Sequence, residues 1–290
     1  MRRSDNGTVR DWEKTLTLEH AHHLEPFFRS FAHAAPLLLL DYDGTLAPFH
    51  VDRFQAVPWP GIRHALALIQ SQKKTRIVVV SGRPASEIPP LLGLAEPVEV
   101  WGLHGFERLH TDGRLEQQRL PQPVARTLEE LHASLQRNSL GGLFEAKSNA
   151  AVMHWRGATP EQAAEIERRI RALFEPAAAI PGFQLLPFDG GLELRAGCDK
   201  SAAVDTVLAE SAPGTPAAYL GDDLTDEAAF RALAGRGLSV LVRSQWRETA
   251  ADMWLKPPGE LLWFLQAWFE AAAHSAIPAA EPASKTSPTA

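Results

Sequence analysis

The sequence predicts an α/β protein with a doubly wound, parallel, Rossmann-like core and an inserted α+β cap domain. Short apolar runs recur along the chain, and each ends abruptly in a polar cluster. Strands that are buried on both faces of a parallel sheet have this continuous apolar pattern, and such sheets bind ligands where their strands end. Between the second and third runs, helix-like and strand-like patterns alternate differently, which indicates a separate α+β unit.

Composition limits the classes of function. The chain has 290 residues, of which 45% are hydrophobic and 22% charged, an ordinary globular mixture that can bury a sizeable core. Its net charge of -6 argues against nucleic acid or an anionic membrane as the main partner, because both attract basic surfaces. The single cysteine, Cys198, excludes an internal disulfide framework and a cysteine-rich zinc site.

Neither a secretory signal nor a membrane helix is expected. The first residues include arginines, but no apolar stretch follows them. No apolar run reaches the length of about 18 residues that a membrane helix needs. We therefore expect a soluble, cytoplasmic protein, and we favour a monomer.

The core elements are expected in a regular order along the chain. Residues 1–35 form an N-terminal helical segment, because apolar side chains recur in it at near-helical spacing. The first strand is the apolar run 36–40, which an amphipathic helix at 59–70 connects to a second strand at 76–80. The third run, 217–220, follows the insertion and completes the strand-helix-strand pattern of a doubly wound sheet.

The inserted unit is predicted to contain two helices and four strands. A helix is expected at 123–137, followed by strands at 143–147 and 150–155. The second helix begins with the capping-box sequence Thr159-Pro-Glu-Gln162, and two more strands are expected within 183–195. The expected divisions of the chain are the helical segment 1–35, the core 36–110 and 192–273, the cap 111–191, and a disordered Pro/Ala/Ser/Thr-rich tail 274–290.

Two aspartates follow the first strand. Asp41 and Asp43 are two residues apart in extended chain, so their carboxylates project from the same side. Such close carboxylates repel each other unless a cation lies between them, and Mg²⁺ prefers oxygen ligands of this kind. A solvated acidic turn is the alternative, but two acidic clusters at strand ends of one sheet favour a metal site. The cluster that could complete the coordination contains Asp222, Asp223 and Asp226.

Ser81 and Lys200 are candidates for phosphate binding. Ser81 and Gly82 follow the second strand and offer a hydroxyl group and an accessible backbone amide. Lys200 begins a helix, where an ammonium group and the helix amides together favour a phosphate. Taken singly, Ser81 would be interpreted as a helix cap and Lys200 as a solvated side chain. Together with the acidic clusters they favour a site for a phosphate or an aspartyl-phosphate.

The segments that contain Asp41, Ser81, Lys200 and Asp222, in their order along the chain, resemble the four motifs of the haloacid dehalogenase superfamily of phosphohydrolases. The resemblance covers about residues 35–265, and the inserted unit is similar to the cap that these enzymes carry between their second and third motifs. The superfamily motifs are Asp41-Tyr-Asp-Gly-Thr-Leu, Ser81-Gly-Arg, Lys200 and Gly221-Asp-Asp-Leu-Thr-Asp-Glu. Four further segments are Gly102-Leu-His-Gly-Phe-Glu107, Phe144-Glu-Ala-Lys147, His154-Trp-Arg156 and Glu193-Leu-Arg195. With these segments the chain looks most like the trehalose-6-phosphate phosphatases within the superfamily.

The resemblance implies Mg²⁺-dependent hydrolysis of trehalose 6-phosphate to trehalose and phosphate through an aspartyl-phosphate. Asp41 would be the nucleophile, and Asp43 would protonate the leaving oxygen and then activate water. The implied Mg²⁺ ligands are Asp41, the carbonyl of Asp43, and Asp222. The transferring oxygens would be held by Ser81 and Lys200. The implied substrate-binding residues are Asp41, Asp43, Gly44, Ser81, Gly82, Arg83 and Lys200 in the core, and Glu145, Lys147 and Glu193 in the cap.

Other functions fit parts of the sequence. Another sugar-phosphate phosphatase or a phosphomutase of the same superfamily would share the core, with sucrose phosphate, mannosyl phosphoglycerate or a hexose phosphate as substrate. A phosphorylated receiver domain is disfavoured, because its acidic pair precedes the accepting aspartate and it has no inserted cap. A catalytically silent carbohydrate-binding homologue is disfavoured because every expected catalytic position is filled. Only the cap residues distinguish among the sugar phosphates.

Overall fold

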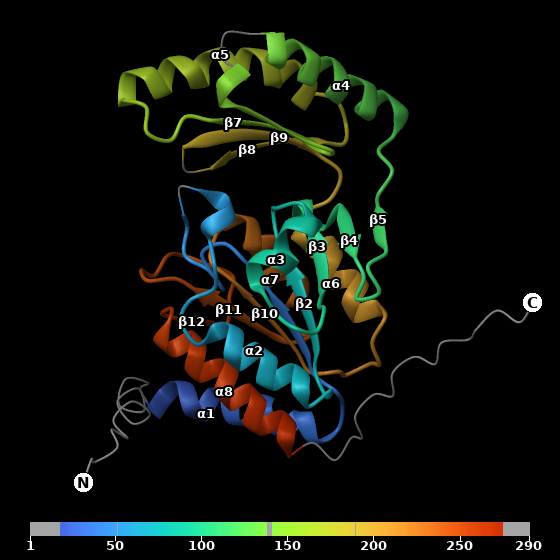
Figure 1. Ribbon diagram of the computed structural model, residues 1–290, viewed down its shortest axis with the longest axis vertical. Coiled ribbons are helices and arrows are strands. Elements are labelled where there is room, and N and C mark those ends of the chain that lie inside the picture. The colour runs from blue at the N-terminus through green and yellow to red at the C-terminus, as the bar shows by residue number, and fades with distance from the viewer. Residues whose placement is uncertain (1–17, 51, 138–140, 189, 275–290) are drawn as a thin grey trace, which may run out of the picture.

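The chain forms an eight-stranded sheet and a four-stranded sheet, each covered by helices. The computed structural model describes residues 18–50, 52–137, 141–188 and 190–274. In Figure 1 the smaller sheet and its two helices lie above the larger unit. The predicted fold class, a doubly wound α/β core with an α+β cap, is confirmed. No helix in these ranges is long and apolar enough to cross a membrane.

The larger sheet is parallel over most of its width. Its strands are β1 (Leu37–Leu40), β2 (Arg76–Val80), β3 (Glu99–Gly102), β4 (Glu107–Leu109), β5 (Leu115–Gln117), β10 (Ala217–Gly221), β11 (Leu238–Val242) and β12 (Met253–Leu255). They are arranged in the order β12-β11-β10-β1-β2-β3-β4-β5. Strands β12 to β3 run parallel, whereas β4 and β5 extend the sheet in antiparallel fashion, an extension that the sequence did not predict.

Helices cover both faces of this sheet (Figure 1). One face carries α1 (Leu18–Arg29), α2 (Ile62–Ser71), α3 (Ile88–Leu92) and α8 (Gly259–Ala273), and the other carries α6 (Lys200–Ala209) and α7 (Glu227–Leu233). In β1, Leu38 and Leu40 pack in the core under the first group, and Leu37 and Leu39 in the core under the second. Burial on both faces explains why this strand is apolar at every position. Short 3-10 helices complete the connections: η2 (Ser30–Ala32), η3 (Arg53–Gln55), η4 (Ala85–Glu87), η5 (Leu103–Gly105), η6 (Gly141–Leu143) and η7 (Leu224–Asp226).

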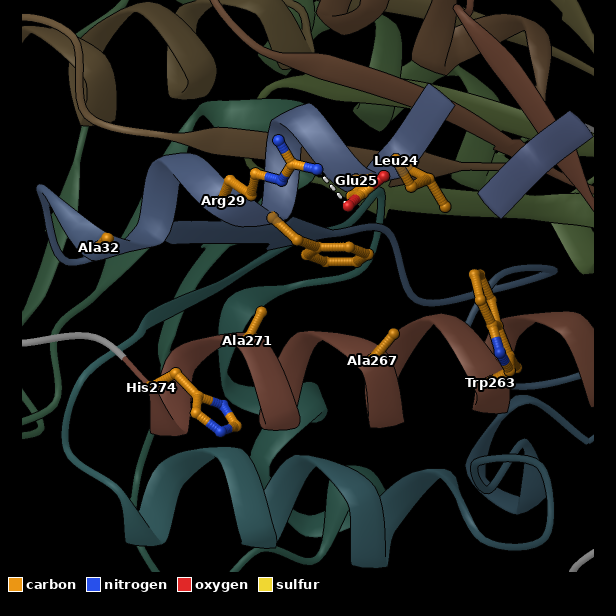
Figure 2. Close-up of a pocket in the computed structure, with 9 residues that line it drawn as sticks. Leu24, Glu25, Arg29, Ala32, Trp263, Ala267, Ala271 and His274 are labelled. Carbon is orange, nitrogen blue, oxygen red and sulfur yellow. Dashed lines mark hydrogen bonds and ion pairs between the residues drawn. The ribbon is translucent and has the colours of Figure 1, made fainter. Parts of the chain in front are cut away.

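The predicted N-terminal helix packs against the C-terminal one. Figure 2 shows α1 lying along α8. A cavity of about 490 Å³ is lined by residues of both helices. Aromatic rings strengthen the contact between the helices just after α1: Phe31 of η2 and Trp268 of α8 are 4.7 Å apart between ring centroids, and both are fully buried. Such edge-to-face pairs add to the free energy gained by burying the rings. Residues 1–17 of the predicted helical segment lie outside the described residues.

The smaller sheet is antiparallel, with its helices on one face only. Its strands are β6 (Phe144–Lys147), β7 (Ala150–His154), β8 (Phe183–Phe188) and β9 (Gly191–Ala196), in the order β6-β7-β9-β8. Helices α4 (Gln122–Arg137) and α5 (Pro160–Ala178) cover the face turned away from the larger sheet (Figure 1). The capping box between Thr159 and Gln162 is formed at the start of α5.

The two connections between the sheets lie at higher residue numbers than the expected boundaries of the cap. Residues 115–117, expected in the cap, form β5 at the edge of the larger sheet, and 191–196 form a central strand of the smaller sheet. The connections are therefore 118–121 and 197–199, rather than the expected 111 and 192. The three residues of β5 are all exposed, so no apolar pattern marked them as a strand. The expected disordered tail lies outside the described residues from 275 onward.

Candidate active site

Three parallel strands deliver the predicted core residues to one edge of the sheet. Strand β1 lies between β10 and β2, and Leu40 pairs with Leu220 on one side and with Val79 on the other. Asp41, Ser81 and Asp222 each follow directly after one of these strands. All three are buried. The sheet topology therefore brings together residues that are far apart in the sequence, as in other doubly wound folds.

Lys200 forms the central ion pair of this cluster. Its ammonium Nζ donates hydrogen bonds to Asp41 Oδ1 at 2.6 Å and to Asp226 Oδ1 at 2.7 Å. The side chain of Asp199 caps the helix by accepting from the amide of Ser201, which is why α6 begins at Lys200. Burial lowers the pKa of Lys200, but the charges of Asp226 and Asp41 outweigh burial and raise that pKa above its ordinary value. The buried lysine therefore remains an ammonium ion.

A surplus of negative charge surrounds Asp222. Carboxylate oxygens of Asp41, Asp222 and Asp226 lie within 4.8 Å of one another, with the single ammonium of Lys200 among them. Burial, together with the charges of Asp41 and Asp226, raises the pKa of Asp222 well above its usual range. Burial also raises the pKa of Asp41 to about 7, although Lys200 opposes that rise. A divalent cation between Asp41 and Asp222 would stabilise the ionised form of both carboxylates.

Gly44 determines how closely Asp222 approaches the chain after β1. Its φ is +82°, and a Cβ atom there would lie 2.0 Å from Asp222 Oδ2. A side chain at position 44 would therefore displace the Asp222 carboxylate. Within the described part of the chain, that carboxylate forms no hydrogen bond, although the residue is buried. It is free to act as a metal ligand.

Asp226, by contrast, is saturated by hydrogen bonds. Its Oδ1 accepts from Lys200 and from the hydroxyl of Tyr219 at 2.6 Å. Its Oδ2 accepts from the backbone amides of Asp222 and Asp223, both at 3.0 Å. A carboxylate with four donors has little capacity left for a cation. Asp226 therefore orients Lys200 and the loop that carries Asp222.

Arg83 binds Asp43 rather than standing free. Its Nε and Nη2 donate to the two carboxylate oxygens of Asp43, both at 2.6 Å, in the two-pronged geometry that guanidinium groups favour. The amide of Arg83 also donates to Ser81 Oγ at 3.1 Å. Arg83 had been expected to bind substrate. In this arrangement its guanidinium contacts the Asp43 carboxylate and the backbone carbonyl of Arg53.

The three predicted cap residues share the face of the smaller sheet that is turned toward this edge. Side chains alternate along a strand, so Glu145 and Lys147 of β6 lie on one face. Neighbours of Glu193 in β9, such as Leu194, pack under the helices on the opposite face. Lys147 Nζ donates to the carbonyl of Gly82 at 3.2 Å and lies 3.9 Å from Glu193 Oε1. The cap residues thus meet the loop after β2.

Buried polar atoms without partners gather around Glu193. Glu193 Oε1, His104 Nδ1 and Arg195 Nε form no hydrogen bond within the described chain, although all are buried. Glu193 Oε2 lies 3.8 Å from His104 Nε2 and 3.9 Å from Arg195 Nη1. Buried polar groups are normally paired, so this cluster suits a ligand with several hydroxyl groups.

His104 and Arg195 were not predicted as site residues. In the sequence, His104 stands only inside the segment 102–107, and its φ of +58° shows that the backbone is strained there. Burial, reinforced by the positive charges of Arg195 and Lys147, holds the pKa of His104 well below its usual range, so the ring is neutral. The signals available in the sequence were the glycine-flanked histidine and the Glu-x-Arg motif.

The family comparison agrees with this geometry. The model of the trehalose-phosphatase family matches residues 39–255, a range that contains every residue of the site described above. The chain belongs to the trehalose-phosphatase family. The predicted resemblance to trehalose-6-phosphate phosphatases is thereby confirmed.

Curated relatives of this trehalose-phosphatase chain include mycobacterial proteins. The trehalose-phosphate phosphatase of Mycobacterium marinum is 31% identical over 245 residues, which are 79% of this chain and 60% of the relative. That of Mycobacterium tuberculosis is 30% identical over the same shares of the two chains. The chain thus spans about three-fifths of the length of these relatives.

Solved structures share the fold of this trehalose-phosphatase chain. Trehalose-6-phosphate phosphatase of Aspergillus fumigatus matches 84% of this chain and 96% of its own, with a TM-score of 0.61 and 23% identity. The C-terminal domain of the Candida albicans trehalose-6-phosphate phosphatase matches 86% and 96%, with a TM-score of 0.68 and 20% identity. A haloacid dehalogenase-like hydrolase of Bacillus subtilis has a TM-score of 0.53 at 16% identity. At these identities the likeness concerns the fold.

Proposed function

We propose that this member of the trehalose-phosphatase family hydrolyses trehalose 6-phosphate to trehalose and phosphate with the help of Mg²⁺. The observation that supports the proposal is that two groups of residues, here called half-sites, face each other across the two sheets. A nucleophile candidate, Asp41, is held by Lys200 at the sheet edge. Facing this edge, a cluster around Glu193 presents buried polar atoms that form no hydrogen bond within the described part of the chain. The first half-site suits a phosphate and the second a polyhydroxyl group.

The core residues fit a divalent metal ion. Three buried carboxylates share one ammonium group, and the carboxylate of Asp222 has no hydrogen-bond donor among the described residues. Asp41, Asp222 and the backbone carbonyl of Asp43 would hold Mg²⁺, whose preference is for such oxygen ligands. When bound, the ion would offset the repulsion between the attacking carboxylate and the phosphate.

Asp41 and Asp43 would perform two successive steps. Asp41 attacks phosphorus while Lys200 and Ser81 hold phosphate oxygens. The bond from phosphorus to the sugar oxygen breaks, and that oxygen takes a proton from Asp43. Asp43 then removes a proton from water, whose oxygen attacks phosphorus and releases the Asp41 carboxylate. Because both oxygens of Asp43 accept from Arg83, Asp43 has to yield one of these contacts to reach the leaving oxygen.

The substrate class can be tested directly by phosphate release in the presence of Mg²⁺. We expect trehalose 6-phosphate to exceed sucrose 6-phosphate, glucose 6-phosphate and p-nitrophenyl phosphate in kcat/KM by about a thousandfold, or roughly 4 kcal/mol of transition-state binding. A clear preference for sucrose 6-phosphate would instead favour the sucrose-phosphate alternative. Similar slow rates on all four substrates would refute the proposed substrate while leaving the core chemistry intact.

Replacing Glu193 with alanine tests the sugar half-site. We expect kcat/KM for trehalose 6-phosphate to fall by about a hundredfold, because a buried hydrogen-bonding partner of the sugar is lost. Hydrolysis of p-nitrophenyl phosphate should change little, since this ester has no sugar hydroxyls. Steady-state kinetics on both substrates measure the difference, and equal losses on the two would contradict a sugar contact.

A further inference from the structure

We propose that Arg53 is a positioning residue for sugar recognition, holding the cap's Glu145 at a fixed place relative to Asp43. The proposal rests on the proposed function, because it takes Glu145 to be a sugar contact, as the family resemblance implies. Arg53 lies in η3, in the loop between β1 and α2, and belongs to none of the motifs in the sequence. The following contacts support the assignment.

The guanidinium of Arg53 joins the core to the cap. Its Nη2 donates to Glu87 in η4, beside the larger sheet, and its Nη1 donates to Glu145 in β6 of the smaller sheet. Glu87 and Glu145 each accept through one oxygen, so a single planar group spans the two carboxylates. A flat fork of donors fixes the direction of each partner as well as its distance.

Glu145 is held at both of its oxygens. Oε1 accepts from Arg53, and Oε2 lies 2.9 Å from Nε2 of His154 on the neighbouring strand β7. Burial raises the pKa of Glu145, but the hydrogen bonds from His154 and Arg53 and the charge of Lys147 outweigh it and lower that pKa to about 2. Glu145 is therefore an oriented carboxylate, with its remaining lone pairs available to a hydroxyl donor.

The backbone of Arg53 is fixed to the reacting centre. Its carbonyl accepts from Arg83 Nη1 at 2.7 Å, and the same guanidinium of Arg83 holds both oxygens of Asp43. A continuous chain of hydrogen bonds thus runs from Asp43 through Arg83 and Arg53 to Glu145. Through these contacts, the position of Glu145 depends on the position of Asp43, the proposed acid.

A purely stabilising role for Arg53 predicts a different outcome. The side chain of Arg53 is 39% exposed, and ion pairs of partly exposed groups contribute little to the free energy of unfolding. Loss of such a pair would change kcat/KM equally for all substrates, or for none of them. A positioning role predicts an effect confined to substrates that contact Glu145.

The test is a double-mutant cycle with Arg53→Ala and Glu145→Ala, assayed on trehalose 6-phosphate and on p-nitrophenyl phosphate. We expect Arg53→Ala to lower kcat/KM for trehalose 6-phosphate by about ten- to a hundredfold, as a small misplacement of a contact would. The rate on p-nitrophenyl phosphate should stay within about twofold. The double variant should be no worse than Glu145→Ala alone, and Arg53→Lys should recover part of the loss.

The matched control is Arg126→Ala. It removes a solvent-exposed ion pair with Glu130 on α4 of the same cap, and it should change neither substrate's kinetics. Losses that add in the double variant, or equal losses on both substrates, would overturn the role of Arg53. Thermal unfolding verifies that each variant is folded, and Arg53→Lys replaces Arg53→Ala in the cycle if the alanine variant is not.

The two levels of the proposal fail in different ways. A wild-type protein that leaves trehalose 6-phosphate intact overturns the proposed function and the assignment of Arg53 with it. A wild-type protein that hydrolyses trehalose 6-phosphate, combined with additive losses in the cycle, overturns the role of Arg53 alone.

Discussion

Replacing Asp41 with asparagine is expected to lower phosphate release from every phosphate ester by a factor of about 10⁵ or more, because an amide cannot attack phosphorus. The side chain keeps its size and can still accept a hydrogen bond from Lys200, so the geometry of the site should persist. The effect should be the same for trehalose 6-phosphate and for p-nitrophenyl phosphate. Phosphate release at saturating Mg²⁺ measures it.

The control for this substitution separates chemistry from folding. Asp41→Asn removes one negative charge from three buried carboxylates that share one ammonium, so we expect no loss of thermal stability. Asp205→Asn alters an exposed aspartate that pairs with Arg236, and it should retain full activity. Activity of Asp41→Asn above about one-hundredth of the wild type would be incompatible with a covalent role for Asp41.

Replacing Asp43 with asparagine should produce losses that depend on the leaving group. For trehalose 6-phosphate we expect kcat/KM to fall by about 10²–10⁴-fold, the usual contribution of a general acid. The p-nitrophenolate group leaves without a proton, so formation of the aspartyl-phosphate from that ester should be much less affected. The second step still needs a base, and the phosphorylated enzyme should therefore accumulate.

Rapid mixing of Asp43→Asn with p-nitrophenyl phosphate measures this difference. We expect a burst of about one nitrophenolate per enzyme, followed by slow turnover. Mass spectrometry of the quenched protein should find the phosphate on Asp41. Absence of a burst together with equal losses on both substrates would show that Asp43 does not act as the acid.

The core half of the site was predictable because its residues follow strands. Asp41, Ser81 and Asp222 come directly after apolar runs, and the carboxyl ends of neighbouring parallel strands share an edge. Lys200 begins a helix, and its proximity to Asp41 was predictable from the family resemblance. These positions depend on local sequence and on one general property of parallel sheets.

The remaining features depend on contacts that no local pattern encodes. Asp226 lies in the same acidic cluster as Asp222, yet only the three-dimensional positions of Lys200 and Tyr219 show that its oxygens are fully used. Arg53 is an ordinary charged residue in a loop, and its importance arises from a contact with a strand of another sheet. The place where the chain leaves the larger sheet depends on such contacts too, because strand pairing puts 115–117 in a sheet that their polar sequence does not suggest.

The separation of the two sheets has a consequence for the diversification of this fold. The residues proposed to break the phosphate ester follow strands of the larger sheet or begin α6, whereas the cap residues proposed to contact the sugar lie in strands of the smaller sheet. We therefore expect that substitutions on the face of β6 or β9 that is turned toward the larger sheet can alter selectivity without disturbing Asp41. A short tether, residues 197–199, nevertheless joins β9 directly to Lys200. A different cap joined at this connection would have to preserve its length, because Lys200 follows it directly.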